Sequence, residues 1–183
     1  MRSRLPWLTI AVLTLTASVT AAMLVWPAVG TALERDPAML SQSEVWRFVT
    51  AWLVQTDGWQ QIGVNFAALA IFGALVESRV GRLWWAIGYV AAGLAGEVAG
   101  IFWQPIGGGN SVAICGLIGV YSVWQARQVG LGNQRFLGSV LWAGIGFWLI
   151  SRADIHGPAL ITGFAIGIFA QVLPIGRVEP SHA

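Results

Sequence analysis

"GGGNSVAICGLIG", residues 107–119, leads from a glycine-rich segment into an apolar run and delivers one serine, Ser111, to the predicted start of a helix. The backbone N–H groups in the first turn of a helix have no partners within the helix, so they point at whatever binds beside Ser111. Together with the helix dipole, these donors would stabilise negative charge on a carbonyl oxygen. The stretch is therefore compatible with a nucleophilic serine, and also with a serine that only caps its helix.

The whole chain around this stretch is strongly apolar. Of its 183 residues, 56% are hydrophobic and 10% are charged, and the mean hydropathy is +0.70. So few charges cannot cover a soluble globule of this size. The formal charge of +2 is too small and too scattered to indicate nucleic-acid binding. We therefore expect an integral membrane protein that contacts the lipid bilayer and does not bind nucleic acid.

Apolar runs long enough to cross the hydrocarbon layer recur along the chain. A transmembrane helix needs about 20 apolar residues to span about 30 Å. The fifth run, about residues 136–150, is the shortest, but Arg135 and Arg152 at its ends can extend their side chains to the two interfaces. The sequence predicts an all-α, polytopic membrane protein with one domain over residues 1–183, whose six transmembrane helices cover about residues 6–28, 59–78, 83–104, 111–126, 136–150 and 155–174.

The arginines predict the orientation of these spans. With the N-terminus in the cytoplasm, seven of the ten arginines fall on the cytoplasmic side, as the positive-inside rule requires. We expect a multi-pass protein of a plasma membrane, most naturally the bacterial inner membrane. Residues 30–58 mix aromatic and polar side chains, which predicts a first loop embedded in the membrane interface rather than a plain linker.

A serine becomes a nucleophile only when a base takes its proton, and His156 is the candidate base. In this orientation Ser111 and His156 both begin spans that enter from the outer face, so they start at the same depth. Small residues that let two helices approach closely follow both positions, at Gly116 and Gly119 on one span and at Ala159, Gly163 and Gly167 on the other. We expect Asp154, two residues before His156, to cap the last helix and to face away from the ring.

Other polar residues inside the predicted spans are each a candidate for function. Gln61 and Asn65 lie four apart on one helical face, where their amides either reach an oxyanion or only hold helices together. Glu97 raises the alternative of a proton-coupled transporter, but no second intramembrane carboxylate accompanies it, so we expect a hydrogen-bonded structural role. One cysteine, Cys115, and two histidines predict no metal site and no cofactor.

From about Glu44 to Gly167 the chain resembles the rhomboid intramembrane serine proteases. "EVWRFVTAWLV" is similar to the family's Trp-Arg element in the first loop, "QQIGVNFAALAIFGALVESRVGRLWWAIGY" to its second span and turn, and "GNSVAICGL" to its Gly-x-Ser-Gly motif. The resemblance implies a six-helix fold with Ser111 as nucleophile and a histidine of the last span as base. It also implies structural roles for Trp46, Arg47, Glu77, Gly81, Gly116, Gly163 and Gly167.

The chain departs from the family pattern at several positions. Val112 follows the serine where the family has glycine, and Gln61 replaces the histidine of a His-x-x-x-Asn pair that ends at Asn65. Aligning "PALITGFAIG" by its glycines puts Leu160 at the histidine position, where leucine cannot accept a proton. A shift of four residues turns a helix by only about 40° and puts His156 in that role instead.

We therefore expect an intramembrane serine endopeptidase that cleaves transmembrane protein substrates near the outer face of the membrane. Ser111 attacks the carbonyl, His156 acts as base and then as acid, and the oxyanion is held by the Ser111 N–H with Asn65 and Gln61. Water must reach these groups, which predicts a polar cavity, and the short fifth span is the candidate lateral gate. The alternative is a catalytically inactive rhomboid-like protein that binds transmembrane helices. The sequence indicates no particular oligomeric state.

Overall fold

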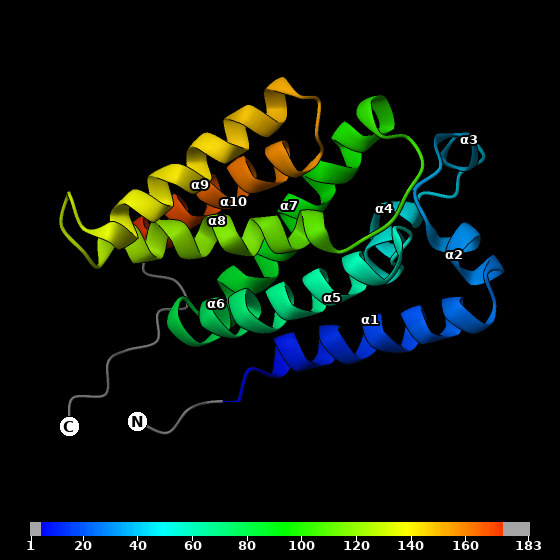
Figure 1. Cartoon of the computed structure of the whole chain (residues 1–183), viewed down its shortest axis with the longest axis horizontal. Coiled ribbons are helices and arrows are strands. Elements are labelled where there is room, and N and C mark those ends of the chain that lie inside the picture. The colour runs from blue at the N-terminus through cyan, green and yellow to red at the C-terminus, as the bar shows by residue number, and fades with distance from the viewer. Residues whose placement is uncertain (1–4, 174–183) are drawn as a thin grey trace.

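The computed structural model describes residues 5–173 of the chain, and every named element within that range is a helix (Figure 1). The all-α class predicted from the sequence is confirmed. The long helices are α1 (Trp7–Val25), α5 (Gly58–Ala68), which continues through the π-helical turn η2 (Leu69–Gly73) into α6 (Ala74–Arg79), α7 (Arg82–Trp103), α8 (Ser111–Arg127), α9 (Gln134–Ser151) and α10 (His156–Val172). The short ones are α2 (Ala28–Leu33), α3 (Pro37–Leu40), α4 (Arg47–Thr50) and η1 (Ala51–Leu53).

Each of the six predicted spans overlaps one of these long helical stretches. Within residues 5–173, three stretches are long and apolar enough to cross a membrane, namely Trp7–Val25, Gly58–Arg79 and Arg82–Trp103, and α10 is a shorter apolar helix. The serine-bearing helix α8 has 17 residues, most of its length being buried by protein. A helix enclosed by its neighbours needs less lipid-facing apolar surface than one at the periphery. The membrane character is shown, and the full count of six spans stays a prediction.

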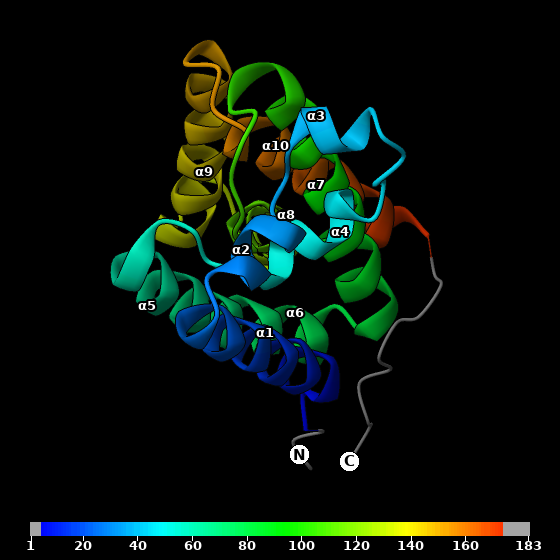
Figure 2. The same cartoon turned by 90° about the vertical axis from the view of Figure 1, so that its right-hand side faces the viewer.

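Helix α8 is the centre of the bundle, with α7, α9 and α10 packed around it (Figures 1 and 2). Its fully buried Leu117 and Val120 belong to a core that also contains Trp84 and Trp85 of α7. The pair α8 and α10 makes the most extensive helix contact of the described part. The central contact therefore joins the helix that begins at Ser111 to the helix that begins at His156.

Glycines bring the backbones of α8 and α10 into direct contact. A Cβ atom added to Gly163 would overlap the carbonyl oxygen of Gly116, and one added to Gly119 would lie 2.6 Å from the backbone nitrogen of Phe164. Gly167, one turn further along, would place a Cβ 2.9 Å from the Val123 side chain. The predicted close approach of the two small-residue stripes is thus present, and it sets the starts of both helices side by side.

The segment between α1 and α5 is folded over the start of α8, as the view in Figure 2 shows for α2 and α4. Arg47 holds it together: its side chain is buried, donates from Nη1 to the carbonyl oxygens of Thr31 at 2.9 Å and Glu34 at 2.8 Å, and pairs through Nε with Glu44 at 2.7 Å. Trp46, at the family's Trp-Arg element, is 51% exposed. The predicted embedded loop is therefore a set of short helices held by one arginine.

At the opposite end of the bundle, Glu77 joins the start of α1 to the turn between α6 and α7. Its buried carboxylate accepts hydrogen bonds from the backbone N–H groups of Leu8 at 3.1 Å and Thr9 at 3.0 Å, and from Arg82 Nε at 3.1 Å. Negative charge at a helix N-terminus is stabilised by the helix dipole. The turn itself needs glycine, since Gly81 has a φ of 114°, which other residues rarely adopt.

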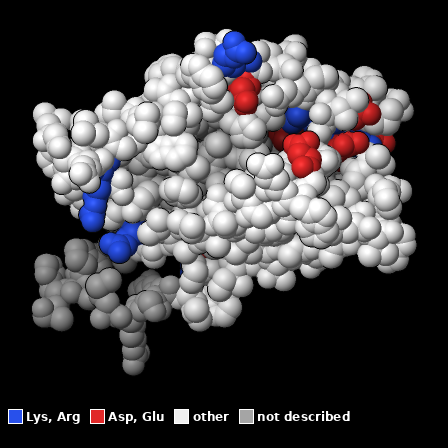
Figure 3. Space-filling view, viewed as in Figure 1, with Lys and Arg blue, Asp and Glu red and all other residues white. Residues whose placement is uncertain are grey.

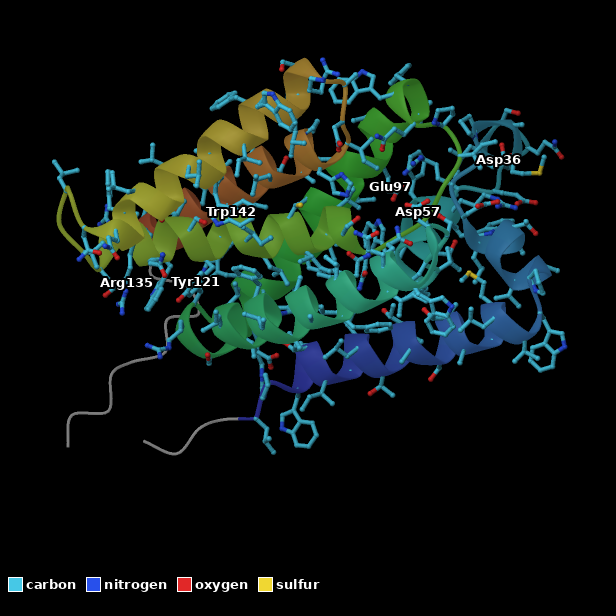
Figure 4. The ribbon with its side chains drawn as sticks, viewed as in Figure 1. Asp36, Asp57, Glu97, Tyr121, Arg135 and Trp142 are labelled. Carbon is cyan, nitrogen blue, oxygen red and sulfur yellow. The ribbon has the colours of Figure 1, made fainter. Side chains whose placement is uncertain are left out.

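Basic side chains are visible at both ends of the molecule, whereas acidic ones are visible towards one end alone (Figure 3). In Figure 3 the visible acidic side chains lie towards the end that carries α2 and the start of α8, whereas the other end shows only basic ones. In Figure 4 Asp36, Asp57 and Glu97 lie towards the first end and Arg135 at the second. A basic end is what the positive-inside rule expects on the cytoplasmic side.

Candidate active site

Ser111 and His156, the first residues of α8 and α10, meet side by side. His156 Nε2 lies 2.7 Å from Ser111 Oγ, a hydrogen-bond distance and within the reach that proton transfer requires. The imidazole side chain is 32% exposed, so it is not sealed in the core. The structure thus brings together the two residues that the sequence singled out as nucleophile and base.

Asp154 contacts the other nitrogen of the same ring, which corrects the sequence-based expectation. Its Oδ1 lies 2.6 Å from His156 Nδ1 and also accepts the His156 backbone N–H at 2.9 Å. Asp154 accepts the backbone N–H of the first residue of α10, as a capping residue does, but it does not face away. Helical periodicity does not predict the direction of this side chain, because Asp154 precedes the helix. A carboxylate at that position folds back over the first turn. An Asp-x-His pattern at a helix start is the signal that could have found this contact.

The charge of Asp154 determines how the imidazole is protonated. The hydrogen bond from the His156 ring lowers the pKa of the Asp154 carboxyl, opposed by a smaller effect of burial. An ionised carboxylate only accepts hydrogen bonds, so the proton in the 2.6 Å contact must be carried by Nδ1. A neutral imidazole with its proton on Nδ1 has a lone pair on Nε2, and the Ser111 hydroxyl then donates to it.

Leu160 and Val112, the departures next to the catalytic candidates, are both buried. Leu160 lies one turn deeper in α10 than His156. Its carbonyl oxygen faces α8, where a Cβ atom added to Gly119 would lie 2.7 Å from it. It is His156, then, that lies opposite the serine. Val112 packs on Gly96 of α7, where an added Cβ would lie 2.8 Å from the valine side chain. Val112 occupies the position where the family has glycine, and Gly96 of α7 leaves the space for its side chain.

A polar cavity of about 350 Å³ adjoins the serine and the histidine. Figure 4 shows Asp57 and Glu97, two of its lining residues, near the start of α8. The predicted polar cavity is therefore present, large enough to hold several water molecules. It is lined by Arg35, Asp57, Gln61, Glu97, Gln104, Ile106, Gly107, Gly108, Gly109, Ser111, Ile155 and His156.

The two amides proposed for the oxyanion flank the loop before Ser111. Gln61 Nε2 donates to the carbonyl oxygen of Gly108 at 3.0 Å and to Asp57 Oδ2 at 3.1 Å. A Cβ on Gly109 would lie 2.5 Å from Gln61 Nε2 and 3.6 Å from Asn65 Nδ2. Both side chains therefore lie beside the backbone two residues before the serine, and both hydrogens of the Gln61 amide have protein acceptors.

Asn65 belongs to a buried chain of amides that the sequence did not reveal. Its Nδ2 donates to Gln55 Oε1 at 2.7 Å, and Gln55 Nε2 donates to Asn110 Oδ1 at 3.0 Å. All three residues are nearly or fully buried. These hydrogen bonds join α5 to the residue that directly precedes Ser111, so they fix the loop of residues 104–110, here called the serine loop, in place.

Glu97 forms a buried ion pair with Arg35, which no pattern in the sequence indicates. The two side chains are 1% and 3% exposed, and Glu97 Oε2 lies 2.6 Å from Arg35 Nη1. Arg35 Nη2 also donates to the Gln104 carbonyl oxygen at 2.6 Å, and its backbone pairs with Gly107. Glu97 is hydrogen-bonded, as expected, and the pair joins α7 to the serine loop. The structural role expected for it stays a prediction.

A family model described as "Rhomboid domain" matches residues 42–176, which is well over half of the chain and includes the serine, the histidine and both flanking amides. No curated protein matches the chain.

Proposed function

Because the chain belongs to the rhomboid family, whose members are generally intramembrane serine proteases, we propose that it is an intramembrane serine endopeptidase. It cleaves transmembrane protein substrates near the outer face of the membrane with Ser111 and His156. The observation that carries the proposal is the 2.7 Å separation between Ser111 Oγ and His156 Nε2, at the edge of a polar cavity.

The reaction follows from this geometry in two stages. Ser111 Oγ forms a bond to the substrate carbonyl carbon while its proton moves to His156 Nε2. The amide C–N bond then breaks, and the same proton passes to the departing amine, which leaves an acyl ester on Ser111. Water from the cavity gives a proton to Nε2, attacks the ester carbon and releases the acid, and the proton returns to Ser111 Oγ.

The negative charge on the carbonyl oxygen is held at the start of α8. The first-turn N–H groups of that helix, including that of Ser111, have no acceptor within the helix, and the helix dipole adds to their attraction for an anion. Asn65 and Gln61 are close enough to the serine loop to contribute. Gln61 must first release the Gly108 carbonyl, so its contribution requires the loop to shift when substrate binds.

Helix α9 is the proposed gate through which a substrate enters from the side. Only Ser139 and Gly146 of its 18 residues are buried, and Leu137, Leu141 and Phe147 are exposed. A helix with few buried contacts moves at little energetic cost. Outward movement of α9 would open a path from the lipid to the starts of α8 and α10.

We also propose that residues 1–183 form one domain with six spans, the N-terminus in the cytoplasm and the site towards the outside of a bacterial inner membrane. The arginine distribution and the basic end of the molecule (Figure 3) support this orientation. The site then acts on substrates at the outer leaflet.

The test is cleavage of a transmembrane substrate of low helix propensity by the purified protein in lipid vesicles. Cleavage is expected from the natural chain and is expected to be absent from Ser111→Ala and His156→Ala. Cleavage that survives either substitution would refute the assignment. Helix binding without any cleavage would instead support the inactive rhomboid-like protein.

A further inference from the structure

We propose that Asp154 is the positioning residue of a Ser–His–Asp arrangement, so that this chain uses three residues where the resemblance implied a serine and a histidine alone. The inference rests on the proposed serine-protease function. Asp154 touches neither the substrate nor the attacking oxygen, and acts through the imidazole of His156.

Each of the two ring nitrogens of His156 has a hydrogen-bond partner. Asp154 Oδ1 lies 2.6 Å from Nδ1, and Nε2 on the opposite side of the ring lies 2.7 Å from Ser111 Oγ. The first distance is shorter than that of a typical neutral N–H···O hydrogen bond, and hydrogen bonds to a charged acceptor are the shorter ones. The carboxylate therefore selects the tautomer that leaves Nε2 free to take the serine proton.

The backbone of Asp154 is held from both sides, which makes its side chain a defined support for the ring. Its N–H donates to the carbonyl oxygen of Leu149 at the end of α9, at 3.0 Å, and its own carbonyl oxygen accepts the N–H of Gly157 in α10, at 3.1 Å. Ala153, just before it, has a φ of 53°, a left-handed conformation that often ends a helix. Asp154 is thus fixed at the junction of the two helices.

The ionised carboxylate has a second effect during the reaction. When His156 takes the serine proton, the ring becomes an imidazolium with a positive charge beside Asp154. Attraction between these charges stabilises the charged ring as the tetrahedral intermediate forms. Asp154 keeps its own charge throughout, and no proton passes to it.

A role as a simple helix cap makes different predictions. A cap needs only an acceptor for the His156 backbone N–H, and asparagine serves there as well as aspartate. The amide of asparagine can instead donate to Nδ1, which moves the ring proton to Nε2 and directs an N–H at Ser111. Asp154→Asn therefore retains the cap and removes the positioning function.

Nuclear magnetic resonance of the ring tests the proposal directly. The chain has two histidines, His156 and His182, so the His182→Gln variant of the full chain, labelled with ¹⁵N-histidine, reports on His156 alone. We expect the neutral ring to carry its proton on Nδ1, and Asp154→Asn to move that proton to Nε2. A ring protonated on Nε2 in the variant with Asp154 intact would overturn the proposal, whether or not any substitution of Asp154 folds.

Kinetics provide the second readout. Asp154→Asn is expected to lower kcat by about a hundredfold or more with KM changed by less than about threefold, since an incorrectly oriented base impairs chemistry and not substrate binding. Asp154→Glu should recover part of kcat because it restores the charge. The matched control is Asp36→Asn, because Asp36 caps α3 through Ala38 N at 2.9 Å and lies outside the site, so its kcat should be unchanged.

The outcomes separate this inference from the proposed function. Activity that depends on Ser111 and His156 but is the same in Asp154→Asn would leave the protease assignment intact and refute the role of Asp154. Activity that survives Ser111→Ala would refute the protease assignment, while the tautomer measurement would still decide whether Asp154 orients the ring.

Discussion

Gly163 of α10 lies so close to Gly116 of α8 that a Cβ atom on Gly163 would overlap the Gly116 carbonyl oxygen. This contact is about two turns below the point where the Ser111 hydroxyl meets the His156 ring. It fixes the spacing of the two helices on which the catalytic candidates depend. The proposed chemistry at the starts of α8 and α10 therefore depends on two glycines further along these helices.

Gly163→Val is expected to separate α8 from α10, lowering the stability by about 1–3 kcal/mol or more and abolishing cleavage. Thermal unfolding in detergent and the cleavage assay measure the two effects. Gly144→Ala on α9 is the matched control, since an added Cβ there meets nothing within 4 Å. Equal stability and activity in Gly163→Val would contradict the close contact.

Breaking the buried ion pair is expected to destabilise the protein strongly. Glu97→Gln leaves the Arg35 guanidinium buried without its counter-charge, which typically costs about 3–5 kcal/mol. The double variant Arg35→Met with Glu97→Gln should recover part of that loss, because no charge is then left unpaired. A double-mutant cycle of unfolding free energies measures this, and additive effects would show that the pair is not coupled.

Histidine at position 160 is expected not to replace His156. Position 160 lies one turn deeper and packs against the backbone of Gly119, so an imidazole there would not reach Ser111 Oγ. The variant His156→Ala with Leu160→His should thus be as inactive in the cleavage assay as His156→Ala alone. Restored cleavage would show that position 160 holds the base.

Acid sensitivity is expected to depend partly on Asp154. Its pKa is lower in the folded chain because the His156 ring donates a hydrogen bond to it, so its stabilising contribution is present above about pH 4, the ordinary aspartate value, and is lost as the pH falls through the lower folded value. Unfolding temperatures below about pH 4 should therefore fall less steeply in Asp154→Asn than in the natural chain. Parallel curves would contradict this contribution.

The fold was largely predictable because apolar runs and arginines mark the long helices directly. The predicted span 83–104 and the helix α7 (Arg82–Trp103) differ by one residue at each end. The short helices within residues 30–58 were not resolved from the sequence, because Arg47 and its carbonyl acceptors organise them, and not a local periodicity.

The candidate site was predictable only in part. Ser111 and His156 could be paired because depth and small-residue stripes constrain where two helices meet. Arg35 was missed because its contact with Glu97 joins residues 62 positions apart, which no local pattern encodes. Helical periodicity does not predict the direction of the Asp154 side chain, because Asp154 precedes the helix.

The most direct test of the central claim, that His156 activates Ser111, is the rate at which a fluorophosphonate probe labels the natural chain and its His156→Ala variant, with the labelled residue identified by mass spectrometry. We predict labelling of Ser111 in the natural chain and a rate at least about a hundredfold lower in the variant, the loss expected when a general base is removed. No labelling of Ser111 in the natural chain, or equal rates in both, would contradict the claim.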